Sequence, residues 1–253
     1  MAEKQKLCVT GAGGYVASWL VKLLLSKGHT VHGTVRNPGD AKYAHLHNLD
    51  KAPHNLKLFK ADLLDYDSLA AAITGCTGVF HVACPKDLVE PALNGTLNVL
   101  KACSESNVKR VVIVSSVSAV FVTPNWPKDK HTVNASSLVL VKLLKEGYET
   151  LENKGRLLVD VRDVVESLLL VYERPEAEGR YICTAHEIKS QDLVEMLKKM
   201  YPNYSYPKSF TAREGDDEKL SSERLQRLGW TYRPLEETLN DSIESYRQAG
   251  ILD

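Results

Sequence analysis

The sequence predicts an α/β fold whose core is a doubly wound parallel sheet. From residue 7 onward, short runs of β-branched residues alternate with longer segments of helical periodicity. The repeated order of strand, helix and strand implies right-handed crossovers, with helices covering both faces of the sheet. A chain of 253 residues, 43% of them apolar, can bury such a core. We therefore expect ligands to bind at the carboxyl ends of the strands.

The first half of the chain contains the elements of this sheet in order. Buried parallel strands are predicted at residues 7–10, 30–36, 56–62, 79–83 and 110–115. Helices are predicted between them at residues 16–27, 68–74 and 89–104. The first of these helices is followed by Gly28, a residue type that commonly terminates helices.

The pattern changes after Pro124. Residues 125–134 carry prolines and charges and predict a loop. Helices are then predicted at residues 137–151, 162–172, 191–200, 218–228 and 235–249, with one strand at residues 180–183. We expect a first domain over residues 1–130 and a smaller, mostly helical domain over residues 131–253. Residues near 156–172 are expected to return to the core of the first domain.

Composition and charge exclude several classes of function. Thirty-two Lys and Arg balance thirty-two Asp and Glu, so neither nucleic acid nor an anionic membrane is an expected partner. The five cysteines are widely spaced and form no Cys-x-x-Cys pair, which argues against a disulfide framework and against a zinc site. No apolar run reaches the length of a membrane span, and we expect a cytoplasmic protein.

A glycine-rich loop between the first strand and the first helix predicts a dinucleotide site. Residues 11–17 (GAGGYVA) follow the strand directly and open the helix. Gly11 would permit the tight turn, Gly14 would let a pyrophosphate approach the helix N-terminus, and Ala17 would allow the helix to pack closely on the sheet. A glycine turn with only a structural role is the alternative. The order of strand, loop and helix favours a Rossmann dinucleotide-binding domain.

The end of the second strand indicates which dinucleotide is bound. An NAD site would place Asp or Glu there, about 20 residues after the loop, to accept from the ribose 2′-hydroxyl. This chain has Arg36, with Lys42 shortly after it, and both suit a 2′-phosphate. NADP(H) is therefore predicted, with a solvated basic loop as the alternative. Asp62, after the third strand, could accept from the adenine amino group or could simply form a turn.

Several further segments carry a family resemblance. They are residues 10–22, 33–38 (GTVRNP), 61–65 (ADLLD), 78–83 (GVFHVA), 94–99 (NGTLNV), 110–112, 115–116, 133–136 (VNAS), 160–164 (DVRDV) and 179–181. Together these segments resemble the extended short-chain dehydrogenase/reductases of plants. The nearest branch is that of cinnamoyl-CoA reductase and its relative dihydroflavonol 4-reductase.

The resemblance implies a reductase that transfers a hydride from NADP(H) and acts as a cytoplasmic monomer in lignin-related phenylpropanoid metabolism. The expected substrate is a small phenolic acyl-CoA thioester, reduced to its aldehyde, with a dihydroflavonol or a small aldehyde as alternatives. Ser116 is expected to hold the substrate carbonyl, with Ser115 as the alternative, and Cys84 is expected to pack beside the nicotinamide. The expected cofactor-binding residues are Gly11, Gly13, Gly14, Tyr15, Val16, Arg36, Lys42, Asp62, Leu63, Val82, Ala83, Cys84 and Ser115.

The chain departs from the family at the proton donor. The resemblance implies a Tyr-x-x-x-Lys within a few dozen residues of Ser116, in which Tyr donates the proton and Lys lowers its pKa. The only tyrosine in that stretch is Tyr148, and the residue four positions later is Glu152. A Tyr-x-x-x-Lys at Tyr204 and Lys208 contains a proline and lies far downstream, so it is not expected to be catalytic.

Two junctions account for this departure. After Pro85 the family has a loop, and after Lys130 it has the catalytic helix followed by a sixth strand. In this sequence the chain passes directly onward at both points. Without that helix, residues 111–114 would expose one face of a buried strand, at a cost of several kcal/mol. We therefore expect that this sequence omits segments of the biological chain. The alternative is a non-catalytic NADP-binding module.

Overall fold

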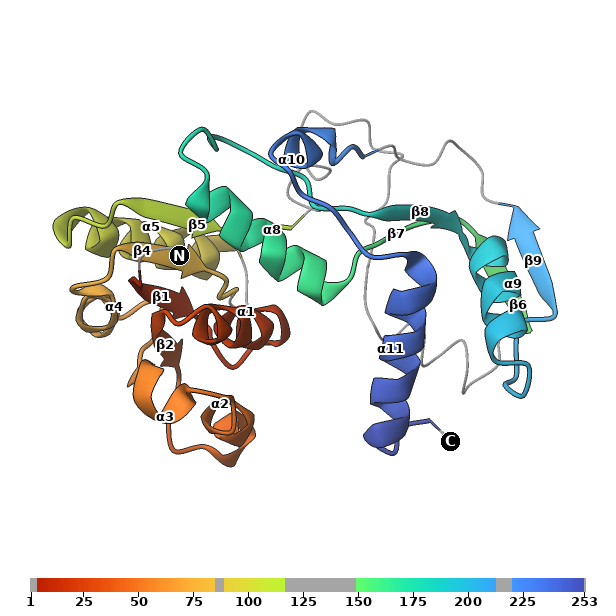
Figure 1. Cartoon of the computed structure of the whole chain (residues 1–253), viewed down its shortest axis with the longest axis horizontal. Coiled ribbons are helices and arrows are strands. Elements are labelled where there is room, and N and C mark those ends of the chain that lie inside the picture. Colours follow the sequence, from red (N-terminus) through yellow and green to blue (C-terminus); the bar gives the residue numbers. More distant parts are fainter. Residues whose placement is uncertain (1–3, 85–88, 117–148, 213–219, 253) are drawn as a thin grey trace. The chain divides into compact units, whose positions relative to one another are not determined.

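The structure is a computed structural model that describes residues 4–84, 89–116, 149–212 and 220–252 (Figure 1). The chain forms two compact units. The first unit comprises Met1–Ser115 and Val164–Gly179, and the second comprises Ser116–Asp163 and Arg180–Asp253. We describe each unit by itself.

The first unit contains a five-stranded sheet in the order β3-β2-β1-β4-β5, in which all neighbouring strands are parallel. From β1 the chain builds outward through β2 and β3, and it then crosses back to add β4 and β5 on the other side. The order therefore reverses between β1 and β4, which is where doubly wound sheets bind ligands. The predicted strands are confirmed as β1 (Lys6–Thr10), β2 (Thr30–Val35), β3 (Leu56–Lys60), β4 (Gly78–His81) and β5 (Arg110–Ile113).

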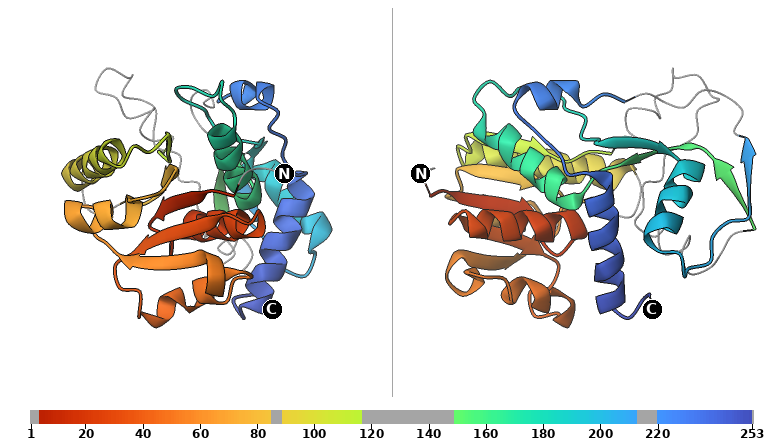
Figure 2. Two further views of the ribbon diagram at one scale, coloured as in Figure 1. Left: turned by 60° about the vertical axis from the view of Figure 1, so that its left-hand side comes forward. Right: turned by 45° about the vertical axis from the view of Figure 1, so that its right-hand side comes forward.

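Helices cover both faces of this sheet, as the left view of Figure 2 shows. On one face, α1 (Tyr15–Ser26) and α8 (Val161–Glu173) pack against the sheet in one apolar cluster. On the other face, α4 (Tyr66–Ile73) and α5 (Val89–Glu105) form a second cluster. Alternation along β1 divides its side chains between the two, because Leu7 and Val9 join the first cluster and Cys8 joins the second.

Three short helical segments that the sequence analysis did not predict connect β2 to β3. They are η1 (Ala41–Tyr43), α2 (Ala44–His47) and α3 (Ala52–Asn55). The Asp40 side chain caps η1 by accepting a hydrogen bond from the backbone amide of Lys42 at 3.1 Å. This cap fixes the backbone that carries Lys42 and Tyr43.

Arg110, the first residue of β5, holds the end of α8. Its guanidinium donates to the carbonyl oxygens of Val171 at 2.9 Å and of Pro175 at 3.1 Å, and it also donates to that of Arg174. The last carbonyls of a helix have no partner within the helix, so a cation with several donors suits this position. The return of the chain to the first core through α8 is thereby tied to the sheet.

The second unit combines helices with short strands that were not predicted. Gly155–Leu158 (β7) pairs antiparallel with His186–Lys189 (β8), and Thr150–Asn153 (β6) pairs parallel with Ser209–Ala212 (β9). The apolar core lies between α9 (Ser190–Met200) and α11 (Leu235–Gln248). A shorter helix, α10 (Glu223–Arg227), precedes α11.

Two predictions for this second half are wrong. The predicted strand at residues 180–183 is irregular, and the nearby strand is β8. Residues 150 and 151, at the end of a predicted helix, instead begin β6. The predicted loop at residues 125–134 and most of the predicted helix 137–151 lie outside the described residues.

A buried carboxylate organises part of the second unit. Asp163 is 1% exposed, and it accepts from the backbone amide of Arg233 at 2.9 Å and from the Arg233 guanidinium. The indole of Trp230 donates to the Asp163 carbonyl at 2.9 Å. Buried charges are stable only when paired in this way.

All five cysteines are free thiols. Within the described ranges, no group of His, Cys, Asp and Glu side chains is arranged to hold a metal ion. No helix in the same ranges is both long enough and apolar enough to cross a bilayer.

Candidate nucleotide-binding site

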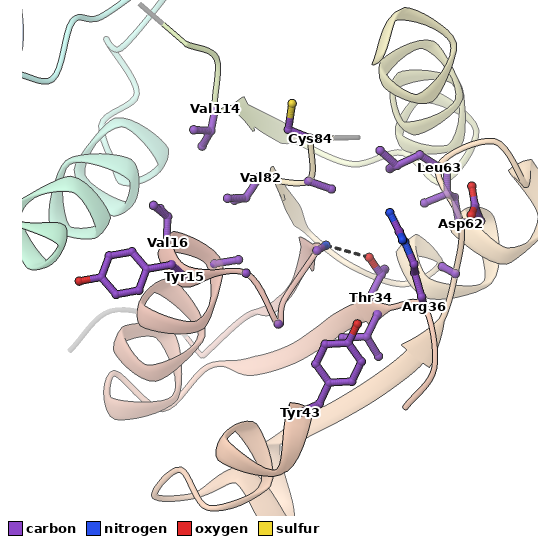
Figure 3. A pocket seen from close by; sticks show the side chains of 18 of the residues that line it. Tyr15, Val16, Thr34, Arg36, Tyr43, Asp62, Leu63, Val82, Cys84 and Val114 are labelled. Atoms are coloured by element: carbon purple, nitrogen blue, oxygen red, sulfur yellow. Dashed lines mark hydrogen bonds between the residues drawn. The ribbon is translucent and has the colours of Figure 1, made fainter. Parts of the chain in front are cut away.

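A cavity of about 930 Å³ opens at the carboxyl ends of the strands of the first unit (Figure 3). It lies beside the glycine-rich loop that joins β1 to α1, at the reversal of strand order. The lining includes these residues expected to bind the cofactor: Gly11, Gly13, Gly14, Tyr15, Val16, Arg36, Lys42, Asp62, Leu63, Val82, Ala83 and Cys84. Ser115, which was also expected there, is not among the lining residues. The structure thus brings the rest of the expected cofactor residues to one place.

Other lining residues are not predicted by any motif in the sequence, and Thr34 and Tyr43 have the clearest roles among them. Thr34 holds the glycine loop: the amide of Gly11 donates to the Thr34 hydroxyl at 3.1 Å, and the amide of Ala12 donates to the Thr34 carbonyl at 2.9 Å. No local pattern identifies this threonine, because the contact joins β2 to a loop more than twenty residues earlier.

The loop backbone needs glycine at position 11. Gly11 has φ +66°, a left-handed conformation that other residues rarely adopt. A Cβ there would also lie 3.0 Å from the Cα and Cβ atoms of Ala83. The loop can therefore approach the end of β4 only because this position lacks a side chain.

The helix N-terminus beside the cavity fits a pyrophosphate. Gly14 is the N-cap of α1, and no side chain caps the helix there. Among the described residues that are not adjacent in the chain, a Cβ at Gly14 would meet only the carbonyl oxygen of Gly11 within 4 Å, at 3.3 Å. The space beside Gly14 is thus open to a ligand, and backbone amides at the start of a helix attract anions.

A chain of polar side chains lies under the cavity and joins β1 to β4. The Thr10 hydroxyl oxygen accepts from the amides of Val82 and Ala83, each at 3.1 Å. It also lies 2.8 Å from Nδ1 of His81. The opposite nitrogen of His81 is 3.2 Å from the Thr96 hydroxyl on α5. These contacts hold the ends of β1 and β4 together, and they fix Val82 and Ala83, which follow β4, beside the cavity.

The two cations after β2 differ in their surroundings. Arg36 makes no hydrogen bond or ion pair with another described residue. The Lys42 ammonium lies 2.7 Å from Oδ2 of Asp40, and the pair holds the pKa of Asp40 below its ordinary value and that of Lys42 above it. Both side chains still face solvent, so the pair is open to exchange with another anion.

Asp62 forms a turn, which is one of the two roles expected for it. Its Oδ1 accepts from the amide of Leu64 at 2.9 Å, and its carbonyl accepts from that of Asp65 at 3.1 Å. Asp62 also lines the cavity. Adenine binding by Asp62 stays a prediction.

The candidate catalytic serines follow β5. Ser115 and Ser116 are both exposed, and Val114 is the last residue of this segment that lines the cavity. Tyr148 lies outside the described residues. Tyr204 and Lys208 have different partners, because Tyr204 accepts from Nε of Arg247 at 3.2 Å and Lys208 lies 3.8 Å from the Glu149 carboxylate.

The described residues therefore provide no Tyr and Lys arranged as a catalytic pair. What they provide is a Rossmann unit with a glycine loop, an open helix N-terminus and cations at the end of β2. This combination defines a dinucleotide-binding protein of the dehydrogenase and reductase class.

Comparisons with known proteins specify the class further. The NAD(P)H-binding family matches residues 11–153. Cinnamoyl-CoA reductase 1 of Petunia hybrida is 38% identical, over 98% of this chain and 94% of the relative, and cinnamoyl-CoA reductase 2 of Arabidopsis thaliana is 34% identical, over 100% and 95%. The crystal structure of vestitone reductase from alfalfa (Medicago sativa) matches with a TM-score of 0.80 at 26% identity, over 98% of this chain and 100% of that chain. The chain belongs to the cinnamoyl-CoA reductase family of extended short-chain dehydrogenase/reductases, a family of NAD(P)H-dependent oxidoreductases.

The lengths of these alignments bear on the missing catalytic pair. The alignments with the petunia and Arabidopsis reductases run over 312 and 316 positions, whereas this chain has 253 residues. The two relatives therefore carry residues inside the aligned region that this chain lacks. That the biological chain carries such segments stays an expectation.

Proposed function

We propose that this protein is an NADPH-dependent reductase that converts a hydroxycinnamoyl-CoA thioester to its aldehyde. The observation that supports NADPH over NADH lies at the end of β2. The chain has no acidic residue there. It has Arg36, which makes no ion pair with a described residue, and the exposed Lys42. A guanidinium offers two parallel donors to a phosphate, whereas an NAD site needs a carboxylate at this point. The similarity to cinnamoyl-CoA reductases supports the substrate.

Each part of the site has a distinct task in this proposal. The amides at the start of α1, with Gly14 leaving room beside them, bind the pyrophosphate. Arg36 and Lys42 bind the 2′-phosphate. Ser116 orients the substrate carbonyl and donates a hydrogen bond as negative charge develops on its oxygen. Bound NADPH supplies the hydride.

The proton donor must come from elsewhere in the active protein. We infer that the active form carries internal segments with a Tyr and a Lys four residues apart. The competing function is a non-catalytic NADP-binding module, favoured by the lack of such a pair near Ser116 in this sequence. A dihydroflavonol or small-aldehyde reductase is the alternative within the family.

The test compares this 253-residue chain with the protein isolated from its source. Each would be given NADPH with a hydroxycinnamoyl-CoA, a dihydroflavonol or a small aldehyde, and products would be separated by chromatography. We expect the isolated protein to have an intact mass above 28.1 kDa and to reduce the thioester fastest. An intact mass of 28.1 kDa with NADPH binding but no turnover would establish the binding module instead. Faster reduction of the dihydroflavonol would show that a dihydroflavonol is the preferred substrate.

We also propose that the protein works as a cytoplasmic monomer on small molecules. The balanced charge supports only the small-molecule part of this proposal, because it gives no general attraction to nucleic acid or to an anionic surface. Light scattering after size-exclusion chromatography would measure the oligomeric state. Microscopy of a fluorescent fusion would locate the protein in the cell.

A further inference from the structure

Tyr43, the last residue of η1, is a buried aromatic side chain in the lining of the cavity. It is 9% exposed, and it belongs to the same apolar cluster as α1 and β2. Figure 3 shows its ring below the glycine loop, on the same side of the cavity as Arg36, with the hydroxyl end directed toward the cavity. A buried tyrosine normally has its hydroxyl near a polar partner.

The ring of Tyr43 occupies the space that a side chain at Gly13 would need. A Cβ built at Gly13 would lie 2.2 Å from Cε1 and 2.3 Å from Cδ1 of Tyr43. Real atoms do not approach so closely, so the loop and the ring fit only because position 13 is glycine. Tyr43 thus supports the loop that the pyrophosphate is expected to contact.

The Lys42 ammonium lies over the ring of Tyr43, 4.9 Å from its centroid. The neighbouring Asp40 carboxylate raises the pKa of Lys42, so this ammonium stays charged beside the ring. Within the described ranges, the Tyr43 hydroxyl donates no hydrogen bond to another residue. Its hydrogen is therefore available to an acceptor such as a phosphate oxygen.

We propose that Tyr43 is a cofactor-specificity residue that donates its phenolic hydrogen to the 2′-phosphate held by Arg36 and Lys42. The inference rests on the proposed NADPH preference and adds a neutral donor to that subsite. A phosphate offers three oxygens as acceptors, more than one guanidinium can saturate. Through its ring against Gly13, the same residue joins the 2′-phosphate end of the site to the pyrophosphate loop.

The test is calorimetric titration of the purified chain with NADPH and with NADH. Tyr43→Phe keeps the ring against Gly13 and removes only the hydroxyl. We expect it to weaken NADPH binding about tenfold, the scale of one hydrogen bond to a charged group, and to change NADH binding less than about twofold. The melting temperature without ligand should stay at the wild-type value. Tyr232→Phe, an exposed tyrosine in the other unit, is the matched control and should change neither affinity.

The outcomes separate this inference from the proposed function. If the wild type prefers NADPH and Tyr43→Phe keeps the full preference, Tyr43 is only a packing residue and the inference is overturned. An equal loss for NADPH and NADH would also overturn it, because the hydroxyl would then act through the loop. If the wild type binds both nucleotides equally well, the NADPH preference itself fails, and the inference fails with it.

Discussion

The hydroxyl of Thr10 donates its hydrogen bond to Nδ1 of His81, 2.8 Å away, and the partners of Thr10 determine this direction. The amides of Val82 and Ala83 both donate to the Thr10 oxygen, so its single hydrogen is left for the imidazole. Nδ1 of His81 is therefore unprotonated, and Nε2 carries the hydrogen that is directed at the Thr96 hydroxyl. His81 is a neutral imidazole in a chain of hydrogen bonds that a second ring proton would break.

This arrangement predicts that the protein loses stability in mild acid. Burial lowers the pKa of His81, and desolvation likewise lowers that of His29 and His32 in the same unit. The unfolded chain binds protons at these histidines as the pH falls below about 6.5, whereas the folded chain binds them only at lower pH. Stability is therefore fully present above pH 6.5 and declines below it, toward the lowered pKa values of the folded state.

Thermal unfolding at pH 7.5, 6.5 and 5.5 would measure this decline. We expect the melting temperature to fall mainly between pH 6.5 and 5.5, and the difference between pH 7.5 and 5.5 to be smaller for His81→Asn. His54→Gln, at an exposed histidine, should keep the wild-type dependence. A melting temperature that does not change between pH 7.5 and 5.5 would contradict the assignment of neutral buried histidines.

Arg36→Asp should reverse the nucleotide preference. The change removes a guanidinium that lines the cavity and has no ion pair with a described residue, and it places a carboxylate where NAD sites have one. We expect NADPH affinity to fall at least about tenfold and NADH affinity to stay similar or improve. Calorimetric titration with both nucleotides provides the measurement. Unchanged NADPH affinity would show that Arg36 does not contact the 2′-phosphate.

Gly14→Val should abolish binding of both nucleotides without unfolding the protein. The new branched side chain would fill the space at the N-terminus of α1 where, outside the adjoining chain, the Gly11 carbonyl oxygen is the one described atom within 4 Å of the new Cβ. The melting temperature would be measured with and without NADPH, which stabilises any protein that binds it. If NADPH raised the melting temperature of the variant as much as that of the wild type, the site would lie elsewhere.

Asp40→Asn should strengthen NADPH binding. The carboxylate of Asp40 pairs with Lys42 at 2.7 Å and would have to give way to the 2′-phosphate. Asparagine keeps an oxygen to cap η1 and removes the competing charge. We expect an increase in NADPH affinity of about two- to fivefold at low salt, with NADH unchanged. Weaker NADPH binding would mean that Asp40 helps to position Lys42 and does not compete for it.

Ser116→Ala should lower kcat of the active form with little effect on NADPH affinity. The lost hydrogen bond would act mainly on the developing negative charge, and one such donor is worth about 10²-fold. Steady-state kinetics on the hydroxycinnamoyl thioester, with calorimetry for NADPH, would separate the two effects. Normal turnover in Ser116→Ala together with collapse in Ser115→Ala would assign the role to Ser115. If the 253-residue chain itself reduced the thioester, the claim that it lacks the proton donor would be refuted.

The first unit could be predicted from the sequence because its signals are local. Each strand from β1 to β5 is a short run rich in apolar or β-branched residues, and the glycine loop lies between a strand and a helix as the nucleotide motif requires. The roles of Thr34 and Tyr43 could not be predicted in the same way. Their contacts with Gly11 and Gly13 join residues more than twenty positions apart, and only the fold brings them together.

The second unit was harder to predict because its strands are weakly patterned. In β8, His186 and Ile188 are half-buried and Glu187 is exposed, so one aliphatic residue is the whole apolar signal. The stronger run at residues 180–183 forms no strand. Its Tyr181 ring packs under the guanidinium of Arg224 instead, 4.6 Å away, which shows how tertiary contacts override β propensity.

The position of β5 also affects how the protein behaves in solution. Among the described strands only β4 pairs with β5, and Ile113 at its end is 46% exposed. Leu93, Leu97 and Leu100 on α5 are exposed as well. A strand edge that no other described strand covers can pair with another chain, and β5 lacks the lysine or proline that protects many edge strands. The colloidal stability of a preparation, and the concentration it tolerates before it clouds, will therefore depend on how well this edge is covered.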